Sequence, residues 1–227
     1  MKTAVLLSGC GVYDGTEIQE AVFTLLSLSQ NNLEYVCTAP NIKQHHVLNH
    51  TNGEEIQEGR NVLFESARIA RGKIISLNEL DFNTISSLVI PGGFGAAKNL
   101  SSWAFNGTDG DVVQGVKELI LHCVDNKKPI VALCISPTLI AKSLEGSNYV
   151  AALTLGTTTE NSEYNIAEIH QAIKSIGANA NEKTINEICV DDNLKIISAP
   201  CYMMDANVDE VYQNIKLAIN QLKQFLK

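Results

Sequence analysis

Short apolar runs alternate with longer amphipathic segments along almost the whole chain. The apolar, largely β-branched runs predict strands at residues 3–8, 33–39, 88–91, 129–134 and 150–155. Apolar residues at helical spacing predict helices at 16–30, 61–71, 109–126, 136–144, 161–176 and 208–226. This alternation is typical of an α/β fold with a mostly parallel sheet and helices on both of its faces.

Two segments depart from that rhythm. Residues 188–191 and 195–198 read as a hairpin, and the polar stretch 41–59 reads as an excursion from the core. The excursion contains His45, His46 and His50, for which a solvated loop is favoured over a metal site because no acidic or thiol partner has ligand spacing with them. The chain contains no linker, low-complexity tract or internal repeat, so residues 1–227 are expected to form a single domain.

The charge balance restricts the partners of the protein. The chain has 17 Lys and Arg residues against 25 Asp and Glu residues, which gives a formal net charge of −8. An acidic surface offers no broad footprint for nucleic acid or anionic lipid. No apolar run approaches the ~18 residues that suggest a membrane span. Nucleic acid and membrane are therefore not expected as partners, and a small molecule or a protein is.

The cysteines indicate a reducing environment. Cys10, Cys37, Cys123, Cys134, Cys189 and Cys201 form no C-x-x-C pair, and the histidines beside them have no metal-ligand spacing. The N-terminal segment has only four consecutive apolar residues, where a secretory signal needs ~7–15. These features predict a cytoplasmic protein without a bound metal, in which most cysteines are small core residues.

Three segments with chemical potential follow predicted strands. They are the glycine-rich stretch 8–15, which leads to Glu17 and Glu20, the stretch 91–99 that begins Pro-Gly-Gly, and the passage 133–138. Ligands of open parallel sheets gather at the carboxyl ends of the strands. We therefore expect a pocket where these segments meet, to which Tyr202 also could contribute.

Cys134 stands at an abrupt passage from a strand to a helix. Such a bend lifts a side chain out of the sheet, and the free N–H groups of the following helix favour a thiolate. Gly92 and Gly93 allow a close backbone approach, so that the amides of Gly93 and Ile135 would form an oxyanion hole. The local sequence is equally compatible with a buried structural cysteine.

Glu17 and Glu20 are three residues apart and share one face of the predicted helix. They are either a solvated acidic first turn or carboxyl groups near the thiol, one of which shuttles its proton.

Taken together, four stretches resemble the ElbB-type glyoxalase family of the PfpI/ThiJ superfamily, which shares the fold of class I glutamine amidotransferases. They are Ser8–Ile18, Asn49-His50, Arg60–Leu63 and Pro91–Leu100. The resemblance implies a flavodoxin-like three-layer α/β/α sandwich with a nucleophile elbow, a homodimer, and cofactor-independent conversion of glyoxal to glycolate. Protein deglycation is the competing interpretation of that activity.

The resemblance also implies roles for individual residues. Cys134 matches the superfamily nucleophile, Glu20 the carboxyl that hydrogen-bonds it, and Gly93 and Ile135 the oxyanion donors, with Gly92 beside them. We expect Glu17, Cys10 and Asn99 in the shell of residues around these groups. Cys10 is either a resolving thiol or, as is favoured, a small residue that fills a tight turn.

Three departures from the superfamily pattern narrow the function. Ile135 directly follows the nucleophile, where the superfamily proteases carry histidine, so peptidase activity is not expected. The amidotransferases need a His-x-Glu after the nucleophile, and this chain lacks that triad because its last histidine is His170. Gly156-Thr157-Thr158 replaces a loop that often carries histidine in the glyoxalases. The remaining hypotheses are a glyoxalase with Cys134 and Glu20 as catalytic residues, a redox-sensing or regulatory module with an oxidisable Cys134, and a non-catalytic partner of a biosynthetic enzyme.

Overall fold

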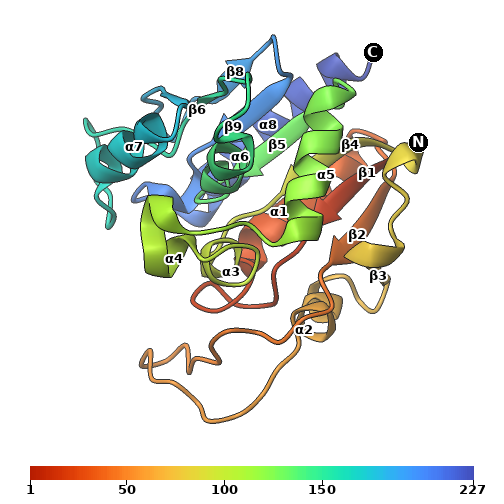
Figure 1. Cartoon of the computed structure of the whole chain (residues 1–227), viewed down its shortest axis with the longest axis vertical. Coiled ribbons are helices and arrows are strands. Elements are labelled where there is room, and N and C mark those ends of the chain that lie inside the picture. Colours follow the sequence, from red (N-terminus) through yellow and green to blue (C-terminus); the bar gives the residue numbers. More distant parts are fainter.

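A seven-stranded sheet forms the centre of the molecule in the computed structural model, which describes all residues 1–227 (Figure 1). Every neighbouring pair in this sheet is parallel except β8 and β9. In spatial order the strands are β3 (Ile74–Ser76), β2 (Tyr35–Ala39), β1 (Lys2–Leu6), β4 (Ile85–Ile90), β5 (Ile130–Leu133), β9 (Ile196–Ala199) and β8 (Cys189–Asp191).

Helices cover both faces of the sheet, which confirms the expected three-layer α/β/α fold (Figure 1). One face packs against α1 (Ile18–Gln30), α2 (Val62–Ile69) and α8 (Val208–Phe225). The other face packs against α3 (Phe94–Lys98), α5 (Gln114–Asp125) and α6 (Pro137–Leu144). The short α4 (Trp103–Asn106) and α7 (Ile166–Ser175) follow at the edge shared by the two cores.

The strands are rich in apolar residues because both faces of the sheet are buried. Along β1, Ala4 and Leu6 enter one core, while Val5 and the following Leu7 enter the other, and all four are 0% exposed. Successive strand side chains point to opposite faces, so a strand between two helical layers favours apolar residues on both faces.

Several expected elements differ in extent from the structure; the helix predicted over 161–176, for example, begins only at Ile166. The helix predicted over 109–126 begins only at Gln114, because Gly107–Asp109 forms a separate 3₁₀ turn and Ser101 forms an antiparallel bridge with Val112. The strand predicted over 150–155 is reduced to β6 (Ala152–Leu153), which pairs with β7 (Asn179–Ala180) in a small second sheet. The hairpin of β8 and β9 is confirmed.

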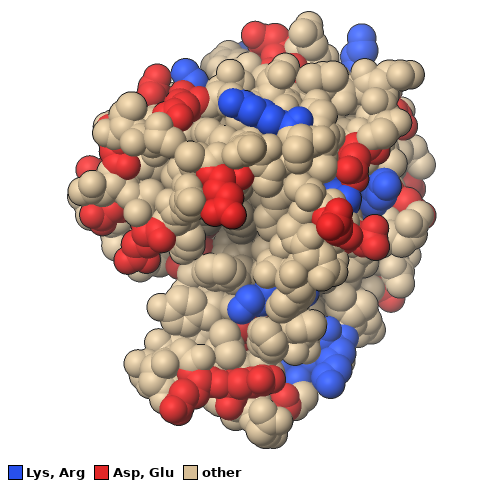
Figure 2. Space-filling view, turned by 60° about the vertical axis from the view of Figure 1, so that its left-hand side comes forward, with Lys and Arg blue, Asp and Glu red and all other residues tan.

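The polar stretch 41–59 is an excursion from the core, as expected, and it projects from the body of the molecule (Figure 1). It holds itself together by isolated bridges such as Leu48 with Glu55. Figure 2 shows a hollow between this segment and the body, and small separate groups of acidic and basic side chains on that face. None of the helices has the length and apolar character required to cross a membrane.

Candidate active site

Cys134 directly follows β5 and has a left-handed backbone, with φ of +58°. Its N–H donates to the carbonyl oxygen of Ala199 on the neighbouring strand at 2.9 Å. The hydroxyl of Ser136 donates to the carbonyl oxygen of Pro91 at 2.8 Å, and Pro137 opens α6. A left-handed non-glycine residue between a strand and a helix is strained. The neighbouring segments therefore hold the elbow that the sequence predicted.

Glu20 brings the first turn of α1 to the thiol. Its side chain is fully buried, and it forms a hydrogen bond with the thiol of Cys134. The N–H groups of Gly92 and Tyr202 donate to its two carboxyl oxygens, at 2.8 Å and 3.4 Å. Glu17 caps α1 instead, because its carboxylate accepts the N–H of Glu20 at 2.6 Å. The structure therefore gives the two carboxyl groups different roles, which the sequence did not distinguish: Glu20 contacts the thiol and Glu17 caps the helix.

Gly92 and Gly93 leave the space in which this pair meets. A Cβ on Gly92 would lie 2.4 Å from the Cβ of Cys134 and 2.7 Å from Oε2 of Glu20. Gly93 has a φ of +94°, and a Cβ there would lie 2.3 Å from the backbone nitrogen of Glu17. The N–H groups of Gly93 and Ile135 both reach the sulfur of Cys134. The predicted oxyanion donors therefore converge on one atom.

Burial dominates the protonation of the pair. Desolvation, reinforced by the charge of Glu17, raises the pKa of Glu20 to about 8. Desolvation and the neighbouring Glu20 raise the pKa of the Cys134 thiol well above its ordinary value, although the N–H groups of Gly93 and Ile135 act in the opposite direction. The expected resting thiolate is therefore wrong, because burial and the carboxyl outweigh those N–H groups. At neutral pH Glu20 is a neutral acid beside a neutral thiol.

An apolar pocket of about 180 Å³ opens onto Cys134. Eleven of its thirteen lining residues are hydrophobic, and Glu17 is the one carboxyl group among them. The sequence placed Tyr202 and the stretch that contains Phe94 here, but not the other aromatic residues that line the pocket, Trp103 and Tyr164. Trp103 begins the very short helix α4 and Tyr164 lies in the loop before α7, where no periodicity indicates which side chains face a cavity.

Asn99 and Cys10 lie apart from the thiol. The side-chain amide of Asn99 donates to the carbonyl oxygens of Ser8 and Asp14, both at 2.8 Å, and its oxygen accepts the N–H of His45 at 2.9 Å. Asn99 therefore fixes the loop after β1 and has no polar atom to spare. Cys10 is close to the ionic groups of Glu65 and Arg68, and it is not among the groups that shift the pKa of Cys134.

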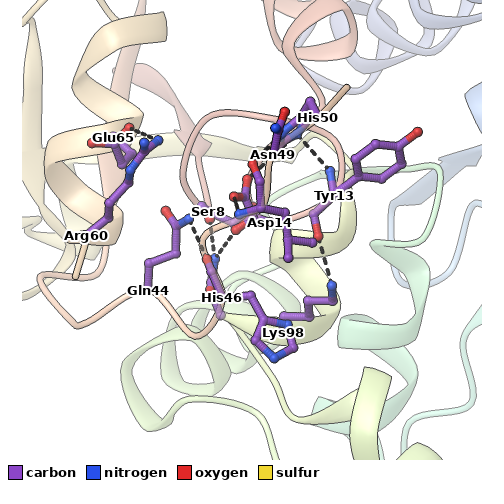
Figure 3. A network of polar contacts seen from close by, with 12 residues as sticks. Ser8, Tyr13, Asp14, Gln44, His46, Asn49, His50, Arg60, Glu65 and Lys98 are labelled. Carbon is purple, nitrogen blue, oxygen red and sulfur yellow. Dashed lines mark hydrogen bonds and ion pairs between the residues drawn. The ribbon is translucent and has the colours of Figure 1, made fainter. Parts of the chain in front are cut away.

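Of the three histidines of the excursion, His50 contacts the same loop through its ring (Figure 3). The ring of His50 accepts the N–H of Tyr13 at 3.2 Å through Nε2, and its Nδ1 lies 3.1 Å from the carbonyl oxygen of Leu48. Lys98 donates to the carbonyl oxygen of Tyr13 at 2.9 Å. His45 and His46 pack against each other, with ring centroids 4.5 Å apart. None of the three lines the pocket at Cys134, and no cluster of side chains suited to a metal is present.

Cys201, which the sequence assigned to the core, is the cysteine beside Cys134. It directly follows Pro200 at the end of β9 and is fully buried, and burial together with the neighbouring Glu20 and Cys134 raises the pKa of its thiol well above its ordinary value. The register of β5 and β9 places the ends of both strands together. The two cysteines are neighbours because β5 and β9 pair although they are distant in the chain. Spacing along the sequence does not indicate which strands pair.

Comparison with known proteins gives a consistent picture, although no family model matches the chain. The chain is 40% identical over 223 residues to the human protein named "Glutamine amidotransferase-like class 1 domain-containing protein 3, mitochondrial", covering 97% of this chain and 82% of that protein. An isoprenoid biosynthesis protein with amidotransferase-like domain from Ehrlichia chaffeensis has a TM-score of 0.90 at 33% identity, with 100% of both chains covered. Drosophila melanogaster DJ-1beta has a TM-score of 0.55 at 14% identity over 99% of this chain and 95% of that chain, and this likeness shows the fold alone.

The comparisons correct the expected cytoplasmic location. The rat and zebrafish relatives are named as mitochondrial ES1 proteins, and the human relative is also named as mitochondrial. The expectation depended on free thiols and on the lack of an apolar leader. All six cysteines are indeed free, but free thiols are compatible with any reducing compartment and do not identify one.

Proposed function

Because this chain belongs to the family of ES1 and glutamine amidotransferase-like class 1 domain-containing proteins, within the PfpI/ThiJ superfamily, we propose that it is a glyoxalase-type enzyme. Its proposed reaction converts a 2-oxoaldehyde into a 2-hydroxy acid. The observation that carries this proposal is the buried contact of Cys134 with Glu20 at the edge of a pocket, with two backbone N–H groups on the same sulfur.

The first step is addition of the thiol to the aldehyde carbon. The sulfur of Cys134 forms the new bond, and the thiol proton passes through Glu20 to the aldehyde oxygen, which gives a hemithioacetal. The step starts from the carboxylate of Glu20, which takes the thiol proton and passes it to the aldehyde oxygen; because its pKa of about 8 lies below that of the thiol, Glu20 is the group of the pair that ionises first. The N–H groups of Gly93 and Ile135 stabilise the negative charge that develops on the oxygen.

The second step is an internal oxidation and reduction. The carboxylate of Glu20 removes the C–H proton of the hemithioacetal carbon, and an enediol forms when the adjacent ketone oxygen is protonated. The enediol hydroxyl on the sulfur-bearing carbon then gives its proton to the carboxylate of Glu20, and Glu20 delivers a proton to the former ketone carbon; this reduces that carbon and leaves the other carbon as a thioester. Water then adds to the thioester carbonyl, the C–S bond breaks, and the 2-hydroxy acid leaves with Cys134 restored as the thiol.

Product analysis tests the proposal. Purified protein is incubated with methylglyoxal in D₂O and followed by proton NMR, with Cys134→Ala as the matched variant. We expect lactate from the wild type, carrying deuterium at the hydroxyl-bearing carbon because Glu20 exchanges its proton with solvent, and none from the variant. Consumption of methylglyoxal by Cys134→Ala at the wild-type rate would contradict the covalent mechanism. The expected homodimer is part of the proposal, and light scattering tests it.

A second candidate is a redox sensor, and the neutral state of Glu20 favours it. Two successive reactions with peroxide would convert the thiol into a sulfinate, and protonated Glu20 would donate a hydrogen bond to one of its oxygens. The raised pKa of Cys134 places this candidate second, because the thiolate is the form that peroxide oxidises. Quantitative addition of two oxygen atoms at Cys134 under mild peroxide, without turnover of oxoaldehydes, would favour the sensor.

A further inference from the structure

The lining of the pocket carries information on the substrate that the reacting groups do not. Beyond Cys134 the walls are formed by Phe94, Trp103, Tyr164 and Tyr202, together with aliphatic side chains such as Ile169. The rings of Phe94 and Tyr164 lie 6.2 Å apart at an interplanar angle of 57°. Such tilted aromatic surfaces form favourable contacts with a further ring placed between or beside them.

The size of the pocket exceeds what a two-carbon substrate fills. A cavity of ~150 Å³ lined by aliphatic and aromatic side chains is large enough to bind benzene, and this pocket has about 180 Å³. Glyoxal, with four non-hydrogen atoms, would leave most of the apolar wall in contact with water. A substrate gains transition-state binding from remote groups only when those groups meet the protein.

The charge of the pocket restricts the substrate further. No Lys, Arg or His residue is among the lining residues, and Glu17 carries the only carboxyl group there. Burial raises the pKa of Glu17. Lys98 is not a lining residue; its ammonium group lies 5.2 Å from the centroid of the Phe94 ring and donates to the carbonyl oxygen of Tyr13. An anionic substrate, with a phosphate or carboxylate group, would therefore enter without a counter-charge.

We propose that the substrate of this site is a neutral 2-oxoaldehyde that carries an aromatic or similarly bulky apolar group. This inference rests on the proposed function. The aldehyde carbon meets Cys134 below Gly93 and Ile135, and the apolar group occupies the space beside Trp103, Phe94 and Tyr164. Apolar surface removed from water contributes ~25 cal/mol per Å², so a phenyl group should raise kcat/KM by at least about tenfold over glyoxal.

Steady-state kinetics of the full chain provide the first test. The rates of mandelate formation from phenylglyoxal and of glycolate formation from glyoxal are compared for the wild type, Trp103→Ala and Phe105→Ala. We expect phenylglyoxal to be preferred at least tenfold, and Trp103→Ala to lower that preference. Phe105 lies on the same short helix but packs against His45 outside the pocket, so Phe105→Ala should keep the preference.

Fluorescence provides a second test that does not depend on turnover. Trp103 is the single tryptophan of the chain, so its emission reports on this pocket alone. In Cys134→Ala, 2-hydroxyacetophenone should produce a saturable change in emission, and hydroxyacetone at equal concentrations should produce none. Free N-acetyltryptophanamide corrects for light absorbed by the ligand.

The outcomes separate this inference from the proposed function. Equal or better turnover of glyoxal than of phenylglyoxal, with no saturable response to 2-hydroxyacetophenone, would overturn the aromatic substrate and retain the glyoxalase. A saturable response without hydroxy-acid formation from any oxoaldehyde would overturn the glyoxalase and retain an aromatic pocket.

Discussion

Cys134 and Cys201 occupy matching places in the fold, at the ends of the adjacent parallel strands β5 and β9. Both are free, both are buried, and both have a left-handed backbone, with φ of +58° and +49°. Only Cys134 lines the pocket and meets Gly93, Ile135 and Glu20 through its thiol. Cys201 packs in the core, and its N–H donates to the side chain of Asn214 at 3.0 Å. Backbone strain is therefore common to both cysteines, and access to a pocket with a proton acceptor distinguishes them.

The largest expected effect tests this comparison directly. Cys134→Ala should reduce hydroxy-acid formation at least ~10³-fold, because the covalent intermediate cannot form. Cys201→Ala should retain the rate within about threefold and lose only a small amount of stability through the cavity it leaves. Initial rates and urea unfolding of both variants provide the measurement. A loss of activity in Cys201→Ala equal to that in Cys134→Ala would show that both thiols belong to the site.

The next largest effect is expected at Glu20, the proton acceptor that forms a hydrogen bond with Cys134 but not with Cys201. Glu20→Gln should lower kcat by ~10²–10⁴-fold, because the amide neither removes nor returns the proton. Since the pKa of Glu20 is about 8, the wild-type rate should rise with pH through that value as the carboxylate forms. A pH–rate profile should lose this ascending limb in the variant. An unchanged limb would assign the titration to another group.

The same carboxyl should make stability depend on pH. Glu20 stays protonated to about pH 8 in the folded protein, whereas in the unfolded chain it ionises near 4.5. Between those values the folded state binds more protons, so the unfolding free energy should fall as pH rises, by ~3 kcal/mol from this group. Urea unfolding at pH 5 and pH 8 should show that Glu20→Gln lacks this part of the decrease. Equal pH dependence in both proteins would contradict the buried neutral acid.

The local sequence pattern is sufficient to predict the elbow at Cys134, but it does not predict the side chains that surround it. The buried strand, the bend at Cys134 and the turn at Gly92 are each contained in a few consecutive residues, and so the sequence predicts them. Trp103 and Tyr164 are about sixty residues apart in the chain and line one pocket. The contact of Cys201 with Cys134 likewise depends on which strands pair, and the late start of α5 depends on a bridge between Ser101 and Val112. Such long-range packing has no local signature.

A smaller effect should follow from closing the space around the thiol. Gly92→Ala places a Cβ 2.4 Å from the Cβ of Cys134, so the elbow or α1 has to shift. Overpacking of this kind costs ~1–3 kcal/mol, and displacement of Glu20 should lower kcat/KM by ~10–100-fold. Gly59→Ala is the matched control, because a Cβ at Gly59 meets nothing within 4 Å. Wild-type kinetics in Gly92→Ala would show that the contact between thiol and carboxyl tolerates displacement.

The smallest expected effect concerns Tyr164, which lines the pocket that Cys134 reaches and Cys201 does not. The hydroxyl groups of Tyr202 and Tyr212 donate to glutamine side chains, whereas the hydroxyl of Tyr164 has no hydrogen-bond partner within the chain. Burial raises the pKa of Tyr164 to about 12, so its hydroxyl remains a hydrogen-bond donor at any working pH.

A substrate oxygen is the natural acceptor for that hydroxyl, and one hydrogen bond contributes ~0.5–1.5 kcal/mol. Tyr164→Phe should therefore lower kcat/KM by ~2–10-fold and leave the unfolding free energy within ~0.5 kcal/mol of the wild type, since no protein group loses a partner. Tyr149→Phe removes a hydroxyl that donates to Asp125 away from the pocket, and it should not change the kinetics. If Tyr164→Phe also leaves kcat/KM unchanged, the hydroxyl makes no contact with the reacting substrate, and the pocket recognises its ligand by apolar surface alone.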